Sequence, residues 1–150
     1  MTKPFRSPAQ EVALGLLRTA SVLSRAMTRA VEPAGISLAQ YNVLRILRGA
    51  GPGGLATLAI RERMIEEGAS ITRLIDKLEA VGMVRRGRTT PDRRQVVCTL
   101  TDAGLHTVER LMPLVEAAED RLDHALSPVE LRTLSTTLDS ARSAFYSRGA

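Results

Sequence analysis

Residues 71–104, ITRLIDKLEAVGMVRRGRTTPDRRQVVCTLTDAG, decide the fold, because a helical pattern is followed at once by two β-prone runs. Apolar side chains recur at helical spacing in the first run, and this predicts a helix. Gly82 suits the left-handed position that closes a helix. Residues 83–86 and 95–100 favour strands, and Thr-Pro-Asp at 90–92 predicts the turn that joins them. The predicted core face of the helix consists of Ile71, Leu74, Ile75, Leu78 and Val81.

The residues before this stretch predict three further helices. Apolar side chains repeat at helical spacing over residues 9–31, which is typical of a long amphipathic helix. Ser37 and Gln40 match a capping box and predict the start of a second helix. A short third helix is predicted over residues 58–64, followed by a tight break at Gly68. This third helix, the break and the helix from residue 71 together have the outline of a helix-turn-helix.

The residues after the hairpin predict two more helices. Thr101 is a good N-cap for the fifth, and Ser127 and Glu130 match a capping box for the sixth. The predicted apolar face of the sixth helix consists of Leu131, Leu134, Leu138, Ala141 and Phe145. A chain of 150 residues favours one domain. The fold class predicted is mainly α with a small β-hairpin.

Positive charge is concentrated in the predicted hairpin. The whole chain has 21 lysines and arginines against 16 acids, a net charge of +5. Residues 83–100 alone contain five arginines and one acid, a net charge of +4. A compact basic patch favours a polyanionic partner, most often nucleic acid. An ordinary solvated hairpin is the alternative.

Other features of the sequence narrow the classes of function. The lone Cys98 cannot form an intramolecular disulfide, which fits a reducing cytosol. We expect it to be a small buried hydrophobe, although its basic surroundings leave a redox role open. No signal peptide, membrane span, catalytic constellation or phosphate-binding loop is evident, so we predict a cytoplasmic protein that is not an enzyme and needs no cofactor. His106 and His124 lack metal-ligand spacing, and we expect surface histidines and no metal site.

The helix from residue 71 offers candidate contacts to DNA on the side opposite its core face. Thr72, Arg73 and Asp76 lie on that side beside small residues, so the helix can enter a major groove. Arg73 can bind a guanine edge or a phosphate, and Thr72 a base or a phosphate. Ser70, at the start of the helix, is placed to donate to a phosphate together with backbone amides.

The hairpin adds a second group of candidate contacts. A strand–turn–strand directly after a helix-turn-helix forms a winged helix, whose tip can lie along a minor groove. Narrow minor grooves concentrate negative potential and attract inserted arginine, which makes Arg94 a candidate. Asp92 can hold and orient that guanidinium in a bidentate pair. Arg88 and Arg93 would neutralise phosphates beside it.

Residues 71–104 resemble the core signature of the MarR family of bacterial transcription regulators. That signature combines a T-R-L-x-D-x-L-E recognition helix, G-x-V-x-R, a D-R-R wing tip and L-T-x-x-G. Residues 37–47, SLAQYNVLRIL, also resemble the second helix of the family. The matching positions are Thr72, Arg73, Leu74, Asp76, Leu78, Glu79, Gly82, Val84, Arg86, Asp92, Arg93, Arg94, Leu100, Thr101 and Gly104.

The resemblance implies a winged helix-turn-helix homodimer that binds double-stranded DNA. Residues 1–36 and 101–150 would form a dimerisation region, and residues 37–100 the DNA-binding region. The paired recognition helices would bind a pseudo-palindromic operator with half-sites about one helical turn (~34–36 Å) apart. Such proteins often repress transcription until a small phenolic or anionic effector, bound between the two regions, releases them.

Some residues depart from the family pattern or leave alternatives open. Glu66 and Glu67 lie beside the break, where acids would face phosphates; either they point away or they weaken binding at that end. Tyr41 and Arg18 can line an effector pocket, but packing and surface positions explain them equally well. The alternative function is a winged-helix module that binds an acidic protein and not DNA.

Overall fold

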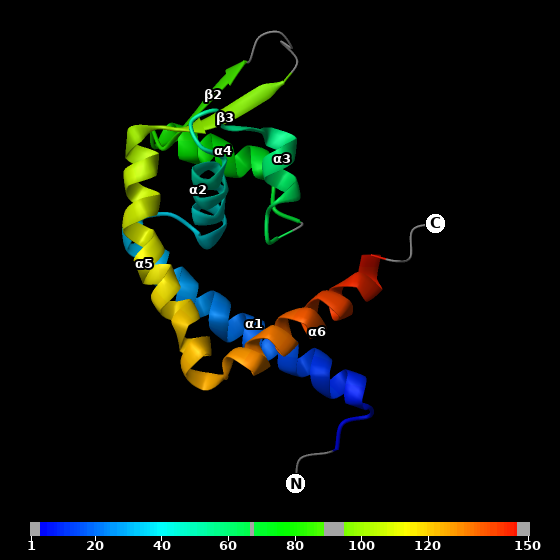
Figure 1. Cartoon of the computed structure of the whole chain (residues 1–150). Coiled ribbons are helices and arrows are strands. Elements are labelled where there is room, and N and C mark those ends of the chain that lie inside the picture. The colour runs from blue at the N-terminus through cyan, green and yellow to red at the C-terminus, as the bar shows by residue number, and fades with distance from the viewer. Residues whose placement is uncertain (1–3, 67, 89–94, 147–150) are drawn as a thin grey trace. The chain divides into compact units, whose positions relative to one another are not determined.

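The computed structural model describes residues 4–66, 68–88 and 95–146, in a mainly helical chain with one small sheet (Figure 1). By its internal contacts the chain divides within α5 into the units Met1–Val115 and Glu116–Ala150. Among the described residues, no helix combines the length and the apolar character that a membrane crossing requires. The elements are α1 (Pro8–Val31), the 3-10 turn η1 (Glu32–Ala34), α2 (Leu38–Ala50), β1 (Leu55–Ala56), α3 (Thr57–Glu62), α4 (Ile71–Ala80), β2 (Val84–Arg88), β3 (Val96–Leu100), α5 (Asp102–Ala125) and α6 (Pro128–Tyr146).

Helix α2 lies at the centre of the first unit, where it contacts α1, α3, α4 and β3. It begins as predicted: the Gln40 N–H donates to Ser37 Oγ at 3.1 Å, and Gln40 Oε1 accepts from the Ser37 N–H at 2.7 Å. This capping box satisfies backbone groups that the first turn leaves without helical partners. The core around α2 includes Val43, Leu44, Leu47, Ile60, Ile75, Leu78, Val84, Cys98, Val108 and Leu111.

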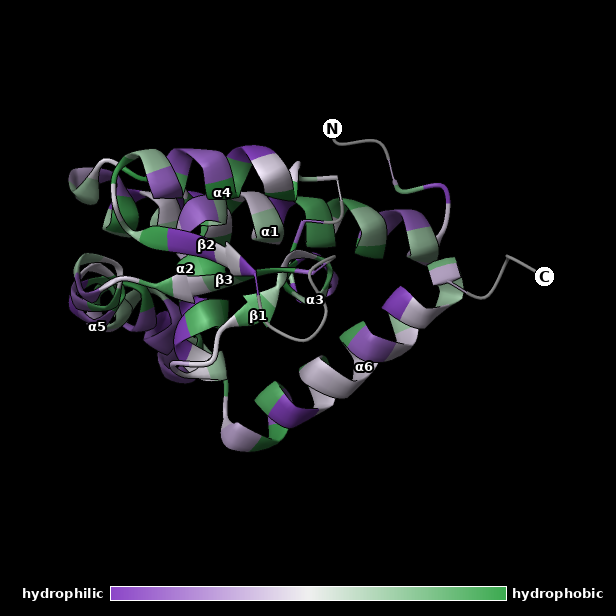
Figure 2. Ribbon diagram, turned by 90° about the horizontal axis from the view of Figure 1, so that it is seen from above, coloured by the Kyte–Doolittle hydropathy of each residue, from purple (hydrophilic) through white to green (hydrophobic). Residues whose placement is uncertain are grey.

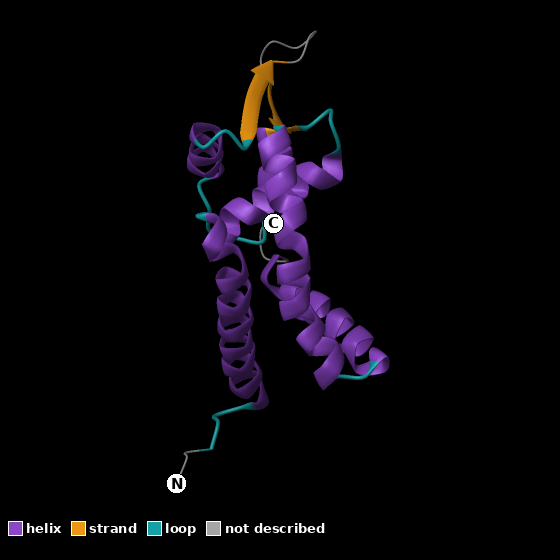
Figure 3. Ribbon diagram, turned by 90° about the vertical axis from the view of Figure 1, so that its left-hand side faces the viewer, coloured by secondary structure: helices purple, strands orange, loops and turns teal. Residues whose placement is uncertain are grey.

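The sheet has three antiparallel strands in the order β1-β3-β2, whereas the sequence predicted only the hairpin of β2 and β3. The strands lie together at one end of the first unit (orange in Figure 3). Strand β1 was missed because its two residues are too few to show an alternating pattern. Cys98, opposite Leu55 and Arg86 in the sheet, is fully buried, which confirms the expected buried thiol.

The end of α4 confirms one prediction and corrects another. Gly82 has φ +74° and donates to the Glu79 carbonyl at 3.0 Å, while Met83 donates to the Leu78 carbonyl at 2.9 Å. These bonds form a Schellman motif, in which a left-handed residue ends the helix. The prediction that Val81 lies in the core is wrong, because its side chain is 60% exposed. The chain turns away at Gly82, and Met83 packs against the core instead.

The connection between α3 and α4 also differs from the prediction. Helix α3 ends at Glu62, so Gly68 does not terminate it in a tight break. Residues 63–70 join the two helices, and within them the Ala69 N–H donates to the Glu66 carbonyl at 3.4 Å. The helix-turn-helix therefore has a longer turn than expected.

Several helices keep apolar side chains in solvent. In α1 only Val31 is buried, and Val12, Leu17 and Val22 are all exposed. In α6, none of the side chains that the structure describes is buried, and Phe145 is 87% exposed. Figure 2 shows hydrophobic positions along both helices. The second capping box is nevertheless formed, since Ser127 and Glu130 exchange hydrogen bonds of 2.8 and 3.3 Å.

Candidate nucleic-acid interface

Helix α4 has one buried side that faces the core and one exposed side that faces outward, as the sequence predicted. Ile71, Ile75 and Leu78 are buried, whereas Thr72 and Arg73 are exposed. Within the described part of the chain, Arg73 forms no ion pair, so its guanidinium keeps its full hydrogen-bonding capacity. The outward side can therefore present one hydroxyl and one cation to a groove.

Ser70 occupies the N-cap position of α4, and its side chain is exposed. Its carbonyl accepts the first helical bond, from the Leu74 N–H at 3.1 Å. Its hydroxyl makes no capping hydrogen bond to the helix. The Ser70 hydroxyl and the first amides of α4 are thus together at the positive end of the helix dipole, the arrangement that phosphate contacts need.

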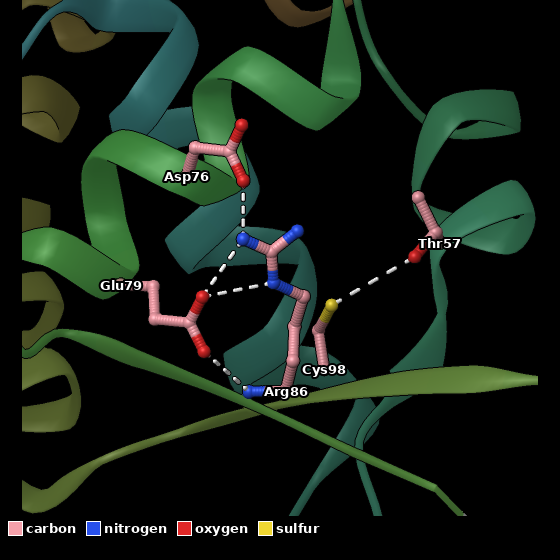
Figure 4. Close-up of polar contacts among 5 residues, drawn as sticks. All are labelled: Thr57, Asp76, Glu79, Arg86 and Cys98. Atoms are coloured by element: carbon pink, nitrogen blue, oxygen red, sulfur yellow. Dashed lines mark hydrogen bonds and ion pairs between the residues drawn. The ribbon is translucent and has the colours of Figure 1, made fainter.

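Arg86 joins the wing to the recognition helix, a role that the sequence did not predict. From β2 its guanidinium pairs with Asp76, and its Nε donates to Glu79 Oε2 at 2.9 Å (Figure 4). Its Nη2 lies 2.8 Å from the same Glu79 oxygen, and its backbone N–H donates to Glu79 Oε1 at 3.4 Å. One residue of the strand is therefore tied to both acids of α4. We call these three residues the Arg86 clamp.

The clamp changes the charge that α4 and the wing present. Hydrogen bonds from Arg86 hold the pKa of Glu79 below its usual range, and the same contacts raise the pKa of Arg86. Glu79 and Arg86 therefore stay ionised near neutral pH. Arg86 offsets one of the two negative charges that Asp76 and Glu79 would otherwise present to phosphates, and these contacts occupy its guanidinium.

The sequence carried a signal for this clamp. Asp76 and Glu79 are three residues apart on a helix, so they lie on one side of it. An arginine at the third residue of the following strand can reach such a pair. All three residues belong to the family signature, but the signature gives no contact between them.

The remaining wing candidates are only partly described. Arg88, the last residue of β2, is exposed and pairs in register with Val96. Arg85, on the same strand, is also exposed. Asp92, Arg93 and Arg94 lie outside the described residues, so the contacts predicted for the wing tip stay predictions.

The pKa of Glu79 gives a direct test of the clamp. We expect Arg86→Gln to raise the Glu79 pKa, because the variant loses the charged donor that stabilises the carboxylate. Since the folded-state pKa is lowered, the stabilisation from this contact is present above the ordinary pKa and is lost as pH falls through the lowered value. An NMR pH titration of glutamate side-chain carbons measures this.

Glu130 is the internal control in that titration. Its pKa is lowered by hydrogen bonds from Ser127, far along the chain from the clamp. Its titration should be the same in both proteins. An unchanged Glu79 pKa in Arg86→Gln would show that the clamp does not form in solution.

Cys98 lies on the inner side of β3, behind the clamp. Burial raises the pKa of its thiol, and Thr57 Oγ1 lies 3.9 Å from its Sγ (Figure 4). A buried thiol with a raised pKa is a poor nucleophile at neutral pH. The packing of the core explains why Cys98 lies at this position.

The fold and the site define a winged helix-turn-helix protein: α3 and α4 form the helix pair, and β2 and β3 form the wing beside it. The sequence model that describes the MarR family matches residues 36–96 of this chain. YkoM of Bacillus subtilis, an HTH-type transcriptional regulator, is 30% identical over 107 residues, which are 71% of this chain and 68% of that protein. The chain belongs to the MarR family of transcription regulators.

Solved structures show the same fold. A mutant of MarR from E. coli, complexed with operator DNA, superposes with a TM-score of 0.79 at 23% identity, over 93% of this chain and 99% of that one. CouR from Rhodococcus jostii, bound to p-coumaroyl-CoA, gives a TM-score of 0.76 at 22% identity, over 91% of this chain and 95% of that one.

Proposed function

We propose that this protein is a sequence-specific DNA-binding repressor that acts in the cytoplasm and is released by a small-molecule effector. The observation that carries the proposal is the outward side of α4, where Thr72 and Arg73 are exposed and Arg86 offsets part of the negative charge of Asp76 and Glu79. Operator DNA bound to MarR and a ligand bound to CouR, proteins of the same fold, support both parts.

In the proposed complex, each residue keeps the role that its chemistry suggests. Arg73 and Thr72 bind base edges or phosphates in the major groove, and Ser70 donates to a phosphate at the start of α4. Arg88 and Arg93 neutralise phosphates. Arg94 enters the minor groove, oriented by Asp92.

The repressor that we propose is a homodimer. Apolar side chains at helical spacing that remain exposed in a single chain need a partner surface, and α1 and α6 both carry them. We assign residues 1–36 and 101–150 to dimerisation and residues 37–100 to DNA binding. Two recognition helices related by a two-fold axis then require a pseudo-palindromic operator.

The first experiment is a titration of the purified protein against the intergenic DNA upstream of its own gene, with competitor DNA, at two salt concentrations. We expect specific binding as a dimer. The logarithm of the affinity should fall linearly with the logarithm of the salt concentration, with a slope of about −0.9 for each phosphate neutralised. If that DNA is not bound, selection from random duplexes replaces it. No preferred sequence in that selection would contradict the proposal and favour a module that binds an acidic protein.

A further inference from the structure

A cavity of about 360 Å³ lies within the first unit, beside the helix-turn-helix. Side chains of α1 and α2 form two of its walls, and residues 64–66, which follow α3, form the third. Its volume is at the lower end of the range for small-molecule sites. Its lining includes neither Arg18 nor Tyr41, the two pocket candidates from the sequence; Tyr41 is buried in the core.

The lining of this cavity is apolar apart from three side chains. Leu23, Met27, Leu38, Met64 and Ile65, with two alanines, supply the apolar surface. The polar members are Ser24, Asn42 and Glu66. Asn42 is buried, and its Oδ1 already accepts a hydrogen bond from Arg45 Nη2 at 2.9 Å. Among the residues that the structure describes, Glu66 is the one charged member of the lining, which includes no arginine, lysine or histidine.

The charge of this lining indicates the charge of the ligand that it can bind. An anion would bring its charge toward the Glu66 carboxylate with no cation in the described wall to compensate it. A positive charge is attracted to the same carboxylate while the rest of the molecule buries apolar surface. We propose that the cavity binds an apolar organic cation, with its charged end at Glu66. This inference rests on the proposed function for the ligand's role as effector, and it departs from the phenolic or anionic class that the family resemblance implies.

The position of Glu66 connects the cavity to DNA binding. Residues 64–66 belong to the connection between α3 and α4, and the Glu66 carbonyl accepts the Ala69 N–H shortly before α4 begins. Met64 also packs against the core. A ligand that contacts this wall changes the segment that sets the start of α4, where Ser70, Thr72 and Arg73 lie. Binding of the cation therefore lowers affinity for DNA.

Three probes with one ring system and different charge test the proposal: 2-naphthylmethylammonium, methyl 2-naphthoate and 2-naphthoate. Binding to the full chain is measured by calorimetry at neutral pH and low salt. We expect the cation to bind about five- to tenfold more tightly than the anion, with the uncharged ester between them. Equal or tighter binding of the anion would overturn the proposal.

Three variants locate the effect. Glu66→Gln should abolish the preference for the cation, whereas Glu62→Gln, an equal change at the end of α3 outside the lining, should preserve it. Ala20→Leu adds a side chain to the wall at an exposed helical position and should weaken binding of all three probes. If Glu66→Gln keeps the preference, or Ala20→Leu binds like wild type, the probes bind elsewhere and the site assignment is wrong.

Release of DNA is measured separately with the operator found for the wild-type protein. The naphthyl cation should weaken operator binding by wild type and less by Glu66→Gln, which lies outside the residues assigned to dimerisation. Binding of the cation without any effect on the operator would contradict the regulatory role. A protein that binds no DNA would defeat the proposed function, while the calorimetry would still decide the ligand class.

Discussion

Replacing Gly104 with alanine is expected to destabilise the protein by about 3 kcal/mol or more. A Cβ atom at Gly104 would lie 2.0 Å from the Met83 carbonyl oxygen and 2.9 Å from the Met83 carbonyl carbon. Both are backbone atoms, and their position is fixed. The Met83 N–H closes the Schellman motif, and its carbonyl accepts the Thr101 N–H at 3.1 Å. Relief of the clash therefore requires the start of α5 to move away from the core.

Gly49→Ala is the matched control, because Gly49 is also in a helix but has open space where the Cβ would be added. Alanine is favoured over glycine in helices, so this variant should gain roughly 0.5–1 kcal/mol. Urea unfolding followed by circular dichroism gives both free energies. A loss below about 1 kcal/mol for Gly104→Ala would mean that α5 does not pack on Met83 as described.

Those features of the fold that depend on neighbouring residues could be predicted from the sequence. The Ser37 and Ser127 capping boxes, the Gly82 helix end and the Thr101 N-cap are each determined within a few residues. Thr101 illustrates this: its Oγ1 accepts the Gly104 N–H at 3.1 Å, as an N-cap should. The wing followed in the same way from two β-prone runs around a turn.

Features that depend on distant residues could not be predicted in this way. Strand β1 forms only because Leu55 and Ala56 reach β3, more than forty residues later, as the register with Cys98 and Val97 shows. Periodicity placed Val81 in the core, because the spacing of apolar residues carries no information on where the helix ends. The close approach of Gly104 to Met83 was likewise invisible, although the motif contained the glycine.

The candidate site shows the same division. Helical periodicity was enough to place Thr72 and Arg73 on the outward side of α4, because the apolar residues define the other side. It placed Asp76 there too, but gave no partner for it. The partner is Arg86 on a different element, so the basic residues of the wing are not equivalent: Arg86 is neutralised by α4, while Arg85 and Arg88 are exposed.

Arg73→Ala is expected to reduce affinity for a cognate operator at least about 30-fold. Each specific contact from an arginine to a base contributes about 1–3 kcal/mol, and a dimer on a pseudo-palindrome loses two of them, about 2–6 kcal/mol. The fold should be unaffected, because the Arg73 side chain is exposed and forms no ion pair among the described residues. A mobility titration with the operator and with unrelated DNA measures the change in affinity and in specificity.

Arg110→Ala is the control for charge, since it removes one exposed arginine from α5, outside the winged region. It should lower binding to operator and unrelated DNA alike, and only slightly. Equal effects of the two variants would show that α4 does not enter the groove.

The salt dependence of Arg73→Ala then separates the two roles that its chemistry allows. If Arg73 binds a guanine edge, the variant loses discrimination between operator and unrelated DNA, and the salt slope changes little. If Arg73 binds a phosphate, affinity for all DNA falls together, and the slope decreases by about 0.9 for each phosphate that is no longer neutralised, or nearly 2 for the dimer. Because Thr72 is adjacent and exposed, Thr72→Val should follow the same pattern with a smaller effect if both side chains reach the same base pairs.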